Sequence, residues 1–181
     1  MKNKFFKHLH MVTKHRAKVF VNCAKCGLFW RGLVHDLSKY SLAEFWEGVK
    51  YYTGKGSPIS ACRKENGYSY AWIHHLKRNK HHIEYWHDFE NNVQMNMPYK
   101  YAVECICDKI ASAKCYKGID FKPEHVLDHW LNFGILVPTN DNMKNFFTTV
   151  FTDYVNNGEK YILNKKYMKQ TYNNLVINKK D

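Results

Sequence analysis

Apolar residues recur along this chain at the spacing of an α-helix, and no segment shows the strict alternation of a half-buried strand. The first such stripe joins side chains three, four and seven residues apart: Val12, His15, Val19 and Cys26. A second stripe lies within residues 140–155: Met143, Phe146, Phe147, Val150, Phe151 and Tyr154. A chain of 181 residues, of which 45% are hydrophobic, can bury a core of its own. These features predict an all-α fold, a single compact bundle of about seven helices in one domain, residues 1–181.

Start and stop signals place the helix boundaries. Helices are predicted over residues 4–25, 28–36, 42–51, 69–89, 98–117, 123–132 and 140–155. Ser41 and Glu44 form a capping box for the third helix. The segment 69–89 is one helix, or two broken near Asn79. Glycine and proline predict a loop from Thr53 to Gly67, and residues 91–97 are a linker. The tail, 161–181, is expected to form a last helix that frays, so that helices within 122–177 complete the bundle.

The charge of the chain is strongly positive. Lysine and arginine exceed aspartate and glutamate by 28 to 16, a formal net charge of +12. Such an excess attracts anions such as nucleotides, nucleic acid and phosphorylated small molecules, although lysines also serve simply as solvated surface charge. No apolar run is long enough to cross a membrane, and the N-terminus lacks the apolar core of a signal peptide. We therefore expect a cytoplasmic protein without a membrane partner, its six cysteines reduced and Cys23 and Cys26 buried as small core residues.

Histidine is unusually frequent, and eight of the 11 histidines fall within residues 8–15 and 74–87. Of these, His15 lies on the first apolar stripe and should face the interior. The adjacent pair His35 and Asp36 follows apolar residues at a helix end, where burying either side chain alone would cost several kcal/mol. Asp108 stands inside an otherwise apolar helix. A divalent metal ion bound by such groups would neutralise them.

Four histidines lie between the doublet and Asp108. His74 and His81, and likewise His75 and His82, are seven residues apart, so each pair shares a face if the helix is continuous. We expect two of these four to face a metal ion. His8, His10, His87, His125 and His129 are expected at the surface or at helix ends.

This ordered set of histidines and aspartates resembles the HD superfamily of metal-dependent phosphohydrolases, over residues 15–108. His35, Asp36 and Lys39 look like the family's doublet with its trailing lysine. The resemblance implies that His15, His35, Asp36 and Asp108 hold a first metal ion. It also implies that Asp36 bridges to a second ion held by His75 and His82. His74 in place of His75, and His81 in place of His82, stay open. The whole chain also resembles a bacterial and phage family with the same doublet.

The resemblance implies an enzyme that hydrolyses a phosphate ester, most plausibly a nucleotide or cyclic nucleotide. Nitrogen and carboxylate ligands suit one or two ions of Mn, Fe, Co, Ni or Zn. The expected catalytic residues are Asp36, Lys39 and His81. Expected to bind substrate phosphate are Arg31, Lys39, Arg78 and Lys80. Aromatic residues around the histidines could stack on a base, although core packing is the commoner role of such rings: Tyr68, Tyr70, Trp72, Tyr85 and Trp86.

Three other functions fit the same residues. Di-iron oxygenases resembling myo-inositol oxygenase use the same set of histidines and aspartates. A basic nucleotide- or nucleic-acid-binding protein would use the charge and the aromatic rings, with a metal site that is not catalytic. A purely structural metal site would have a closed shell of ligands.

Overall fold

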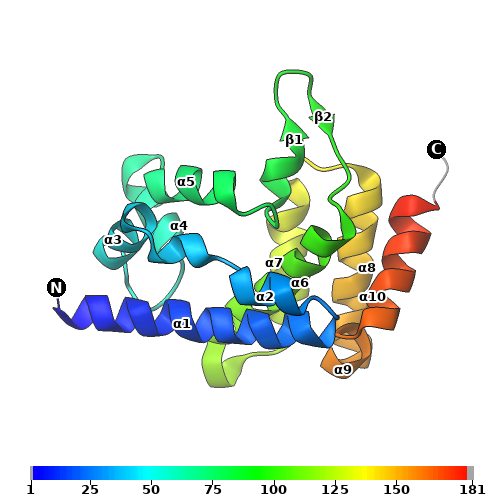
Figure 1. Ribbon diagram of the computed structural model, residues 1–181, viewed down its shortest axis with the longest axis horizontal. Coiled ribbons are helices and arrows are strands. Elements are labelled where there is room, and N and C mark those ends of the chain that lie inside the picture. Colours follow the sequence, from blue (N-terminus) through cyan, green and yellow to red (C-terminus); the bar gives the residue numbers. More distant parts are fainter. Residues whose placement is uncertain (1, 179–181) are drawn as a thin grey trace.

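The computed structural model describes residues 2–178, and within them the chain is predominantly helical (Figure 1). Ten α-helices are present, where about seven were expected. The helices of the N-terminal half are α1 Lys2–Lys25, α2 Phe29–Val34, α3 Leu42–Lys50, α4 Pro58–Asn66 and α5 Tyr70–Arg78. Those of the C-terminal half are α6 Tyr99–Lys117, α7 Glu124–Asn132, α8 Asp141–Asn157, α9 Glu159–Ile162 and α10 Lys165–Tyr172. The predicted all-α class is confirmed.

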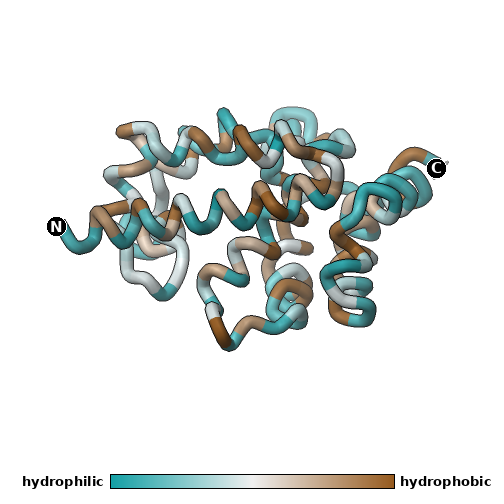
Figure 2. Tube along the Cα trace, turned by 60° about the horizontal axis from the view of Figure 1, so that its bottom comes forward, coloured by the Kyte–Doolittle hydropathy of each residue, from teal (hydrophilic) through white to brown (hydrophobic). Residues whose placement is uncertain are grey.

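The long helix α1 supports the rest of the N-terminal half. It packs against α2, α6 and α3, and α3 in turn packs against α4 and α5. Figure 2 shows hydrophobic and hydrophilic residues alternating along α1 at helical spacing. The predicted stripe of Val12, His15, Val19 and Cys26 is buried. Cys23 is buried as well, so the two cysteines are core residues, as expected.

The C-terminal half holds the apolar core. Its largest fully buried side chains come from α7 and α8: Trp130, Phe146, Phe147, Phe151 and Tyr154. The predicted stripe of α8 is therefore confirmed. The tail is helical in α9, in α10 and in a π-helical turn over Asn173–Ile177. The end that was expected to fray, residues 179–181, lies outside the described residues.

The predicted loop from Thr53 to Gly67 is wrong in its second half, where α4 lies. Pro58 begins this helix at a first position that needs no N–H donor, and Gly67 ends it in the left-handed conformation, at φ 81°. Pro58 and Gly67, two of the residues that suggested a loop, are therefore the start and stop signals of a short helix.

The predicted helix over Lys80 to Phe89 is also wrong. The chain breaks at Asn79, as one alternative expected, and then forms a 3-10 turn over Ile83–Trp86. A short antiparallel hairpin follows, β1 His87–Asp88 with β2 Val93–Gln94, which projects beyond the helices (Figure 1). The Asn79 side chain ends α5, because its amide donates to the carbonyl oxygen of His75 at 2.8 Å and to Ser38 Oγ at 2.8 Å.

Candidate metal centre

The His35–Asp36 doublet lies just beyond the end of α2, which ends at Val34. Gly32 lets α2 approach α1 closely, since a Cβ at this position would lie 2.8 Å from Cys23 Cβ. Arg16 of α1 fixes the turn by donating to the carbonyl oxygens of His35 at 2.7 Å and Leu33 at 2.9 Å. Asp36 adopts the left-handed conformation, with φ 51°, which is uncommon outside glycine and is often found at functional sites. The doublet is thus held by contacts from a separate helix.

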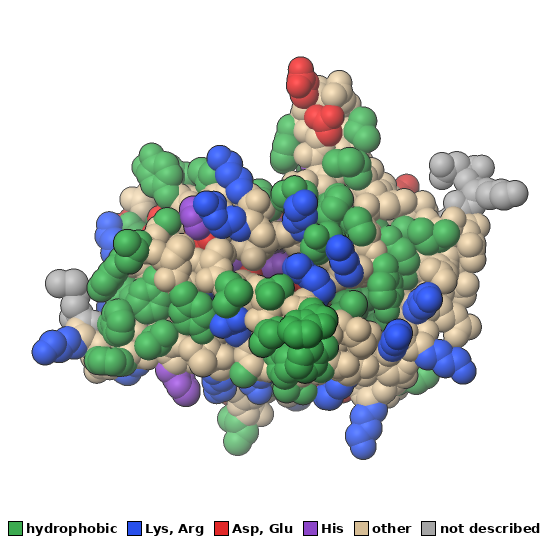
Figure 3. All heavy atoms as spheres, viewed as in Figure 1, with side chains coloured by type: hydrophobic (Ala, Val, Ile, Leu, Met, Phe, Trp, Pro, Cys, Tyr) green, Lys and Arg blue, Asp and Glu red, His purple; other side chains and the backbone are tan. Residues whose placement is uncertain are grey.

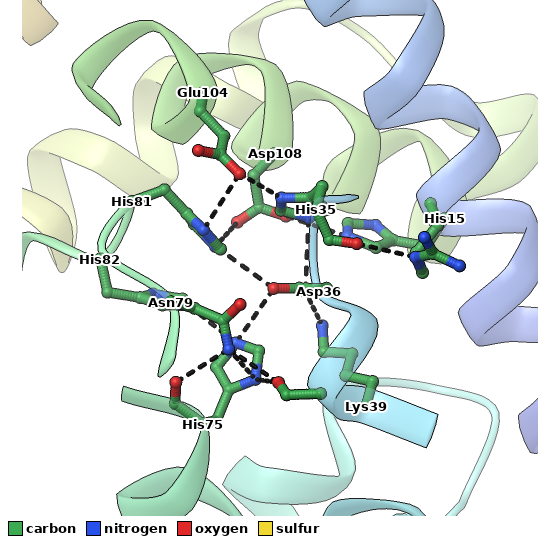
Figure 4. Close-up of polar contacts among 12 residues, drawn as sticks. His15, His35, Asp36, Lys39, His75, Asn79, His81, His82, Glu104 and Asp108 are labelled. Atoms are coloured by element: carbon green, nitrogen blue, oxygen red, sulfur yellow. Dashed lines mark hydrogen bonds and ion pairs between the residues drawn. The ribbon is translucent and has the colours of Figure 1, made fainter. Parts of the chain in front are cut away.

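A first group of four side chains gathers around this doublet: His15, His35, Asp36 and Asp108. The Nε2 atom of His15 lies 2.9 Å from Asp108 Oδ1, and the Nε2 atom of His35 lies 3.3 Å from Asp36 Oδ2. One atom from each residue lies within 4.8 Å of the others. These side chains come from α1, the doublet and α6, so the packing of α1 on α6 assembles the group (Figure 4).

A second group shares Asp36 and adds three histidines: Asp36, His75, His81 and His82. The Nε2 atoms of His75 and His81 lie 3.3 and 3.6 Å from Asp36 Oδ1. The Nε2 atoms of His75 and His82 are 2.9 Å apart. The two oxygens of Asp36 therefore face different groups, Oδ2 the first and Oδ1 the second.

Several atoms of the two groups that face each other are buried without a hydrogen-bond partner. They include His35 Nε2, His81 Nε2 and Asp36 Oδ1, whereas Asp36 Oδ2 pairs with Lys39. A neutral imidazole directs a lone pair from one ring nitrogen, and a lone pair beside a carboxylate is repulsive unless a cation lies between them. Such groups are normally paired or coordinate a metal. These buried residues could hold a metal ion.

The electrostatics agree with that need for positive charge. Although burial opposes the change, His35 and Lys39 hold the pKa of Asp36 well below its usual range. Burial and neighbouring His35 lower the pKa of His81 to about 3, so its ring is neutral and able to act as a ligand. The pKa of His82 is likewise lowered, by burial and by His81. Although burial opposes the change, neighbouring carboxylates, Asp36 first among them, raise the pKa of His35 well above its usual range. A divalent ion bound by nitrogen and oxygen would replace the proton that His35 then carries.

A cavity of about 250 Å³ opens beside the two groups. Lys39, His75, His82 and Asp108 line it on the side of the metal centre, and Tyr52, Trp72 and Tyr116 are among its other walls. The Lys39 Nζ atom lies 2.7 Å from Asp36 Oδ2, so its charge is held between the centre and the cavity. Figure 3 shows a histidine side chain in a hollow near the middle of one face, with Lys and Arg side chains close by.

The structure brings together most of the residues that the sequence analysis singled out: His15, His35, Asp36, Lys39, His75, His81, His82 and Asp108. Three of the four clustered histidines join the second group, where two were expected, because the break at Asn79 folds His81 and His82 back onto Asp36. The fourth, His74, contacts Glu44 instead, at 2.7 Å.

Three predicted phosphate-binding residues lie elsewhere. Arg31 pairs with the buried carboxylate of Glu104 at 2.6 Å. Arg78 and Lys80 are exposed, and neither lines the cavity. Lys39 is the predicted phosphate ligand that faces the cavity.

Two buried glutamates beside the centre were not predicted from the sequence. Glu104 and Glu44 accept hydrogen bonds from His35 Nδ1 at 3.0 Å and His75 Nδ1 at 2.7 Å. Glu104 stands one helical turn before Asp108 in an apolar helix, a spacing that could have identified it. Glu44 was assigned only to the capping box. The structure contains one bond of that box, in which the Glu44 backbone N–H donates to Ser41 Oγ.

Two expectations about other rings are wrong. His8 was expected at the surface but is buried against Phe45 and Gly48, where α1 and α3 pack. Tyr68 and Tyr70 are 52% and 68% exposed, so these rings are not in the core. Of the five aromatic residues that were singled out, Trp72 lines the cavity. Tyr52 and Tyr116 also line it, and their spacing along the chain gave no sign of this.

Within residues 2–178, no helix combines the length and the apolar character needed to cross a membrane. No curated protein and no solved structure matches the chain. Residues 4–152 match a family of unknown function, DUF5662, and this span includes both groups of the metal centre. The chain therefore belongs to the DUF5662 family.

Proposed function

We propose that this protein is a metal-dependent phosphohydrolase of the HD type that acts on a phosphate ester, such as a nucleotide or cyclic nucleotide. The observation that carries the proposal is the pair of buried groups that share Asp36 and border a cavity lined by Lys39. A structural site alone would not need such a cavity, because its ligands close around the ion.

Each part of the centre has a role in this reaction. Bound divalent ions would act as Lewis acids and activate water for attack on phosphorus. Asp36 offers one oxygen to each group and sets the spacing between them. Lys39 places a positive charge at the edge of the cavity, where a phosphoryl group gains negative charge in the transition state.

The cavity supports a small phosphate ester. Its volume of about 250 Å³ lies just below the usual range for ligand sites, about 300–1,000 Å³, so it would enclose the phosphate and part of the organic group. The rings of Tyr52, Trp72 and Tyr116 offer flat apolar surfaces to that group. The net charge of +12 would attract an anionic substrate.

The test begins with metal analysis of the purified protein beside His35→Ala and Asp108→Ala. His10→Ala is the matched control, because His10 lies on the exposed face of α1. We expect the wild-type and control proteins to retain metal and both site variants to lose it. A screen for phosphate release from nucleotides and cyclic nucleotides then identifies the substrate.

Three results would contradict the proposal. Metal retained by both site variants would refute the ligand assignment. Bound iron with oxygen consumption on a polyol or phosphonate, and no phosphate release from any ester, would favour an oxygenase instead. Anion binding that survives chelation and falls steeply with salt would indicate a binding protein.

A further inference from the structure

A single buried carboxylate lies behind both groups of the metal centre. Glu104 of α6 is fully buried, and its Oε1 atom lies 3.0 Å from His35 Nδ1 and 3.5 Å from His81 Nδ1 (Figure 4). His35 belongs to the first group and His81 to the second. One oxygen atom of Glu104 therefore contacts a histidine from each group, on the side of the ring away from Asp36.

The position of this oxygen determines which nitrogen of each ring keeps a lone pair that can bind a metal ion. A neutral imidazole that donates its Nδ1–H to a carboxylate keeps its lone pair on Nε2. The Nε2 atoms of His35 and His81 both point toward Asp36, at 3.3 and 3.6 Å from its oxygens. A carboxylate behind a metal-ligating histidine fixes the tautomer and the ring orientation and makes the ligand more basic. Glu104 does this for His35 through a hydrogen bond, and the same Oε1 atom lies 3.5 Å from His81 Nδ1, where its negative charge favours a proton on that nitrogen.

Arg31 completes this arrangement. Its Nε and Nη2 atoms donate to Glu104 Oε2 at 2.9 and 2.6 Å, so the second oxygen is engaged and Oε1 stays turned toward the histidines. The guanidinium also lies over the ring of Tyr101, 4.9 Å from its centroid. The pairing supplies the positive charge that a fully buried carboxylate requires.

Glu44 provides an internal comparison. Its Oε2 atom lies 2.7 Å from His75 Nδ1, and its Oε1 atom lies 2.7 Å from His74 Nδ1. His75 belongs to the second group only, and His74 belongs to neither. Both glutamates thus support a histidine through Nδ1, but Glu44 serves one group and Glu104 serves two.

We propose that Glu104 is a positioning residue that couples the two metal groups, orienting His35 and His81 together, with Arg31 as its counter-ion. This inference rests on the proposed function for its premise that both groups hold metal ions. It gives Arg31 a role behind the centre, away from the substrate.

The test compares zinc binding by the wild-type protein, Glu104→Gln and Glu44→Gln, using titration against a competing chelator. An amide at 104 would direct a donor at either Arg31 or the histidines, where a carboxylate only accepts. We expect Glu104→Gln to weaken both zinc equivalents, each by about 10- to 100-fold, the usual effect of removing such a partner. Glu44→Gln should weaken one equivalent and leave the other unchanged.

Several outcomes would overturn the coupling. These are unchanged affinity in Glu104→Gln, loss of one equivalent only, or one equivalent bound by the wild-type protein. A third equivalent that only Glu104→Gln loses would make Glu104 a ligand. A wild-type protein that binds no zinc, manganese or iron would instead refute the proposed function itself.

A second measurement does not depend on how the variant folds. Nitrogen-15 NMR of the zinc-loaded wild-type protein reports which ring nitrogen of each histidine carries a proton. We expect His35 and His81 both to carry it on Nδ1, with a hydrogen-bonded resonance shifted downfield. A proton on Nε2 of either ring, or an Nδ1 without a proton, would overturn the proposal even if Glu104→Gln cannot be purified.

Discussion

The molecule has two buried centres of opposite character. Around α7 and α8 the interior is built from aromatic rings, with Trp130, Phe146 and Phe147 fully buried. Around the doublet it is built from ionisable groups, with His35 and Glu104 equally buried at 0% exposure. The depth of burial is the same. The side chains of the apolar centre pack against one another, whereas several nitrogen and oxygen atoms of the polar centre have no hydrogen-bond partner.

The difference separates the apolar residues that stabilise the fold from the candidate metal centre. Burial of apolar surface stabilises a fold directly, and in a closely packed core each buried ring adds to the free energy of unfolding. Burial of unpaired carboxylates and imidazoles costs stability unless a cation compensates it. The apolar centre should therefore hold the fold together in all conditions, and the polar centre should do so only with metal bound.

The largest expected effect comes from breaking the apolar centre. Phe147→Ala removes a ring that packs on Trp130 at a centroid distance of 5.1 Å. We expect a loss of about 3–5 kcal/mol in the free energy of unfolding, with or without metal. Urea unfolding measures it, and Phe133→Ala, at a 65% exposed position, is the control that should change little. Equal, small losses in both variants would argue against a close-packed core.

Metal removal should destabilise the polar centre alone. At free zinc 100 times its dissociation constant, each bound ion would add about 2.7 kcal/mol to the free energy of unfolding. Asp36→Asn should abolish most of this gain, since Asp36 belongs to both groups, and asparagine tolerates the left-handed backbone there. Thermal unfolding with and without a chelator measures the difference. A variant that gains as much from zinc as the wild-type protein does would show that Asp36 is not shared.

A third substitution should act in opposite directions on stability and binding. His81 is fully buried, and its ring nitrogens form no hydrogen bond: the carboxylate oxygens beside them, Glu104 Oε1 and Asp36 Oδ1, lie 3.5 and 3.6 Å away. In metal-free protein we expect His81→Leu to raise the free energy of unfolding by about 1 kcal/mol, because an unsatisfied polar group is removed. The same variant should lose zinc from the second group. If His81→Leu destabilises the metal-free protein, the histidine makes a contribution to packing that the polar contacts do not explain.

The smallest effect concerns pH and lies outside the ligand set. Burial, with a smaller contribution from Lys39, lowers the pKa of His8 to about 4, whereas an unfolded chain has a histidine pKa near 6.5. Between these values the unfolded state binds the extra proton, so His8 makes the fold less stable as pH falls from about 6.5 to 4. His8→Gln should match the wild-type protein at pH 7.5 and be relatively more stable at pH 5. Unfolding midpoints at the two pH values, without metal, would show it, and a constant difference between the proteins would contradict it.

Local patterns predicted the helices well and the segments between them poorly. The stripe on α1 and the one on α8 were correct because helical spacing is a local property of the chain. The break at Asn79 was one of two alternatives, and the hairpin that follows was missed. The Asn79 side chain contacts Ser38, a residue of a distant segment that local patterns do not reveal. Helix α4 was missed because its proline and glycine were interpreted as loop residues.

The candidate site was predictable as a set of residues but not as two groups. Helical spacing placed His15 inside, and the doublet and Asp108 stood out as charges in apolar surroundings. The choice among the four clustered histidines depended on the direction of the chain after α5. The spacing of Glu104 before Asp108 is a local signal, but its contacts with His35 and Arg31 depended on which helices pack together.

By itself, the sequence determined that the chain is helical and that several ionisable residues, among them His15 and Asp108, lie on apolar faces, since both properties depend on neighbours a few positions apart. Only the tertiary structure decided that Asp36 lies between two groups of histidines and that Glu104 backs both. These contacts join residues dozens of positions apart, and the close packing of α1, α2 and α6 sets their distances.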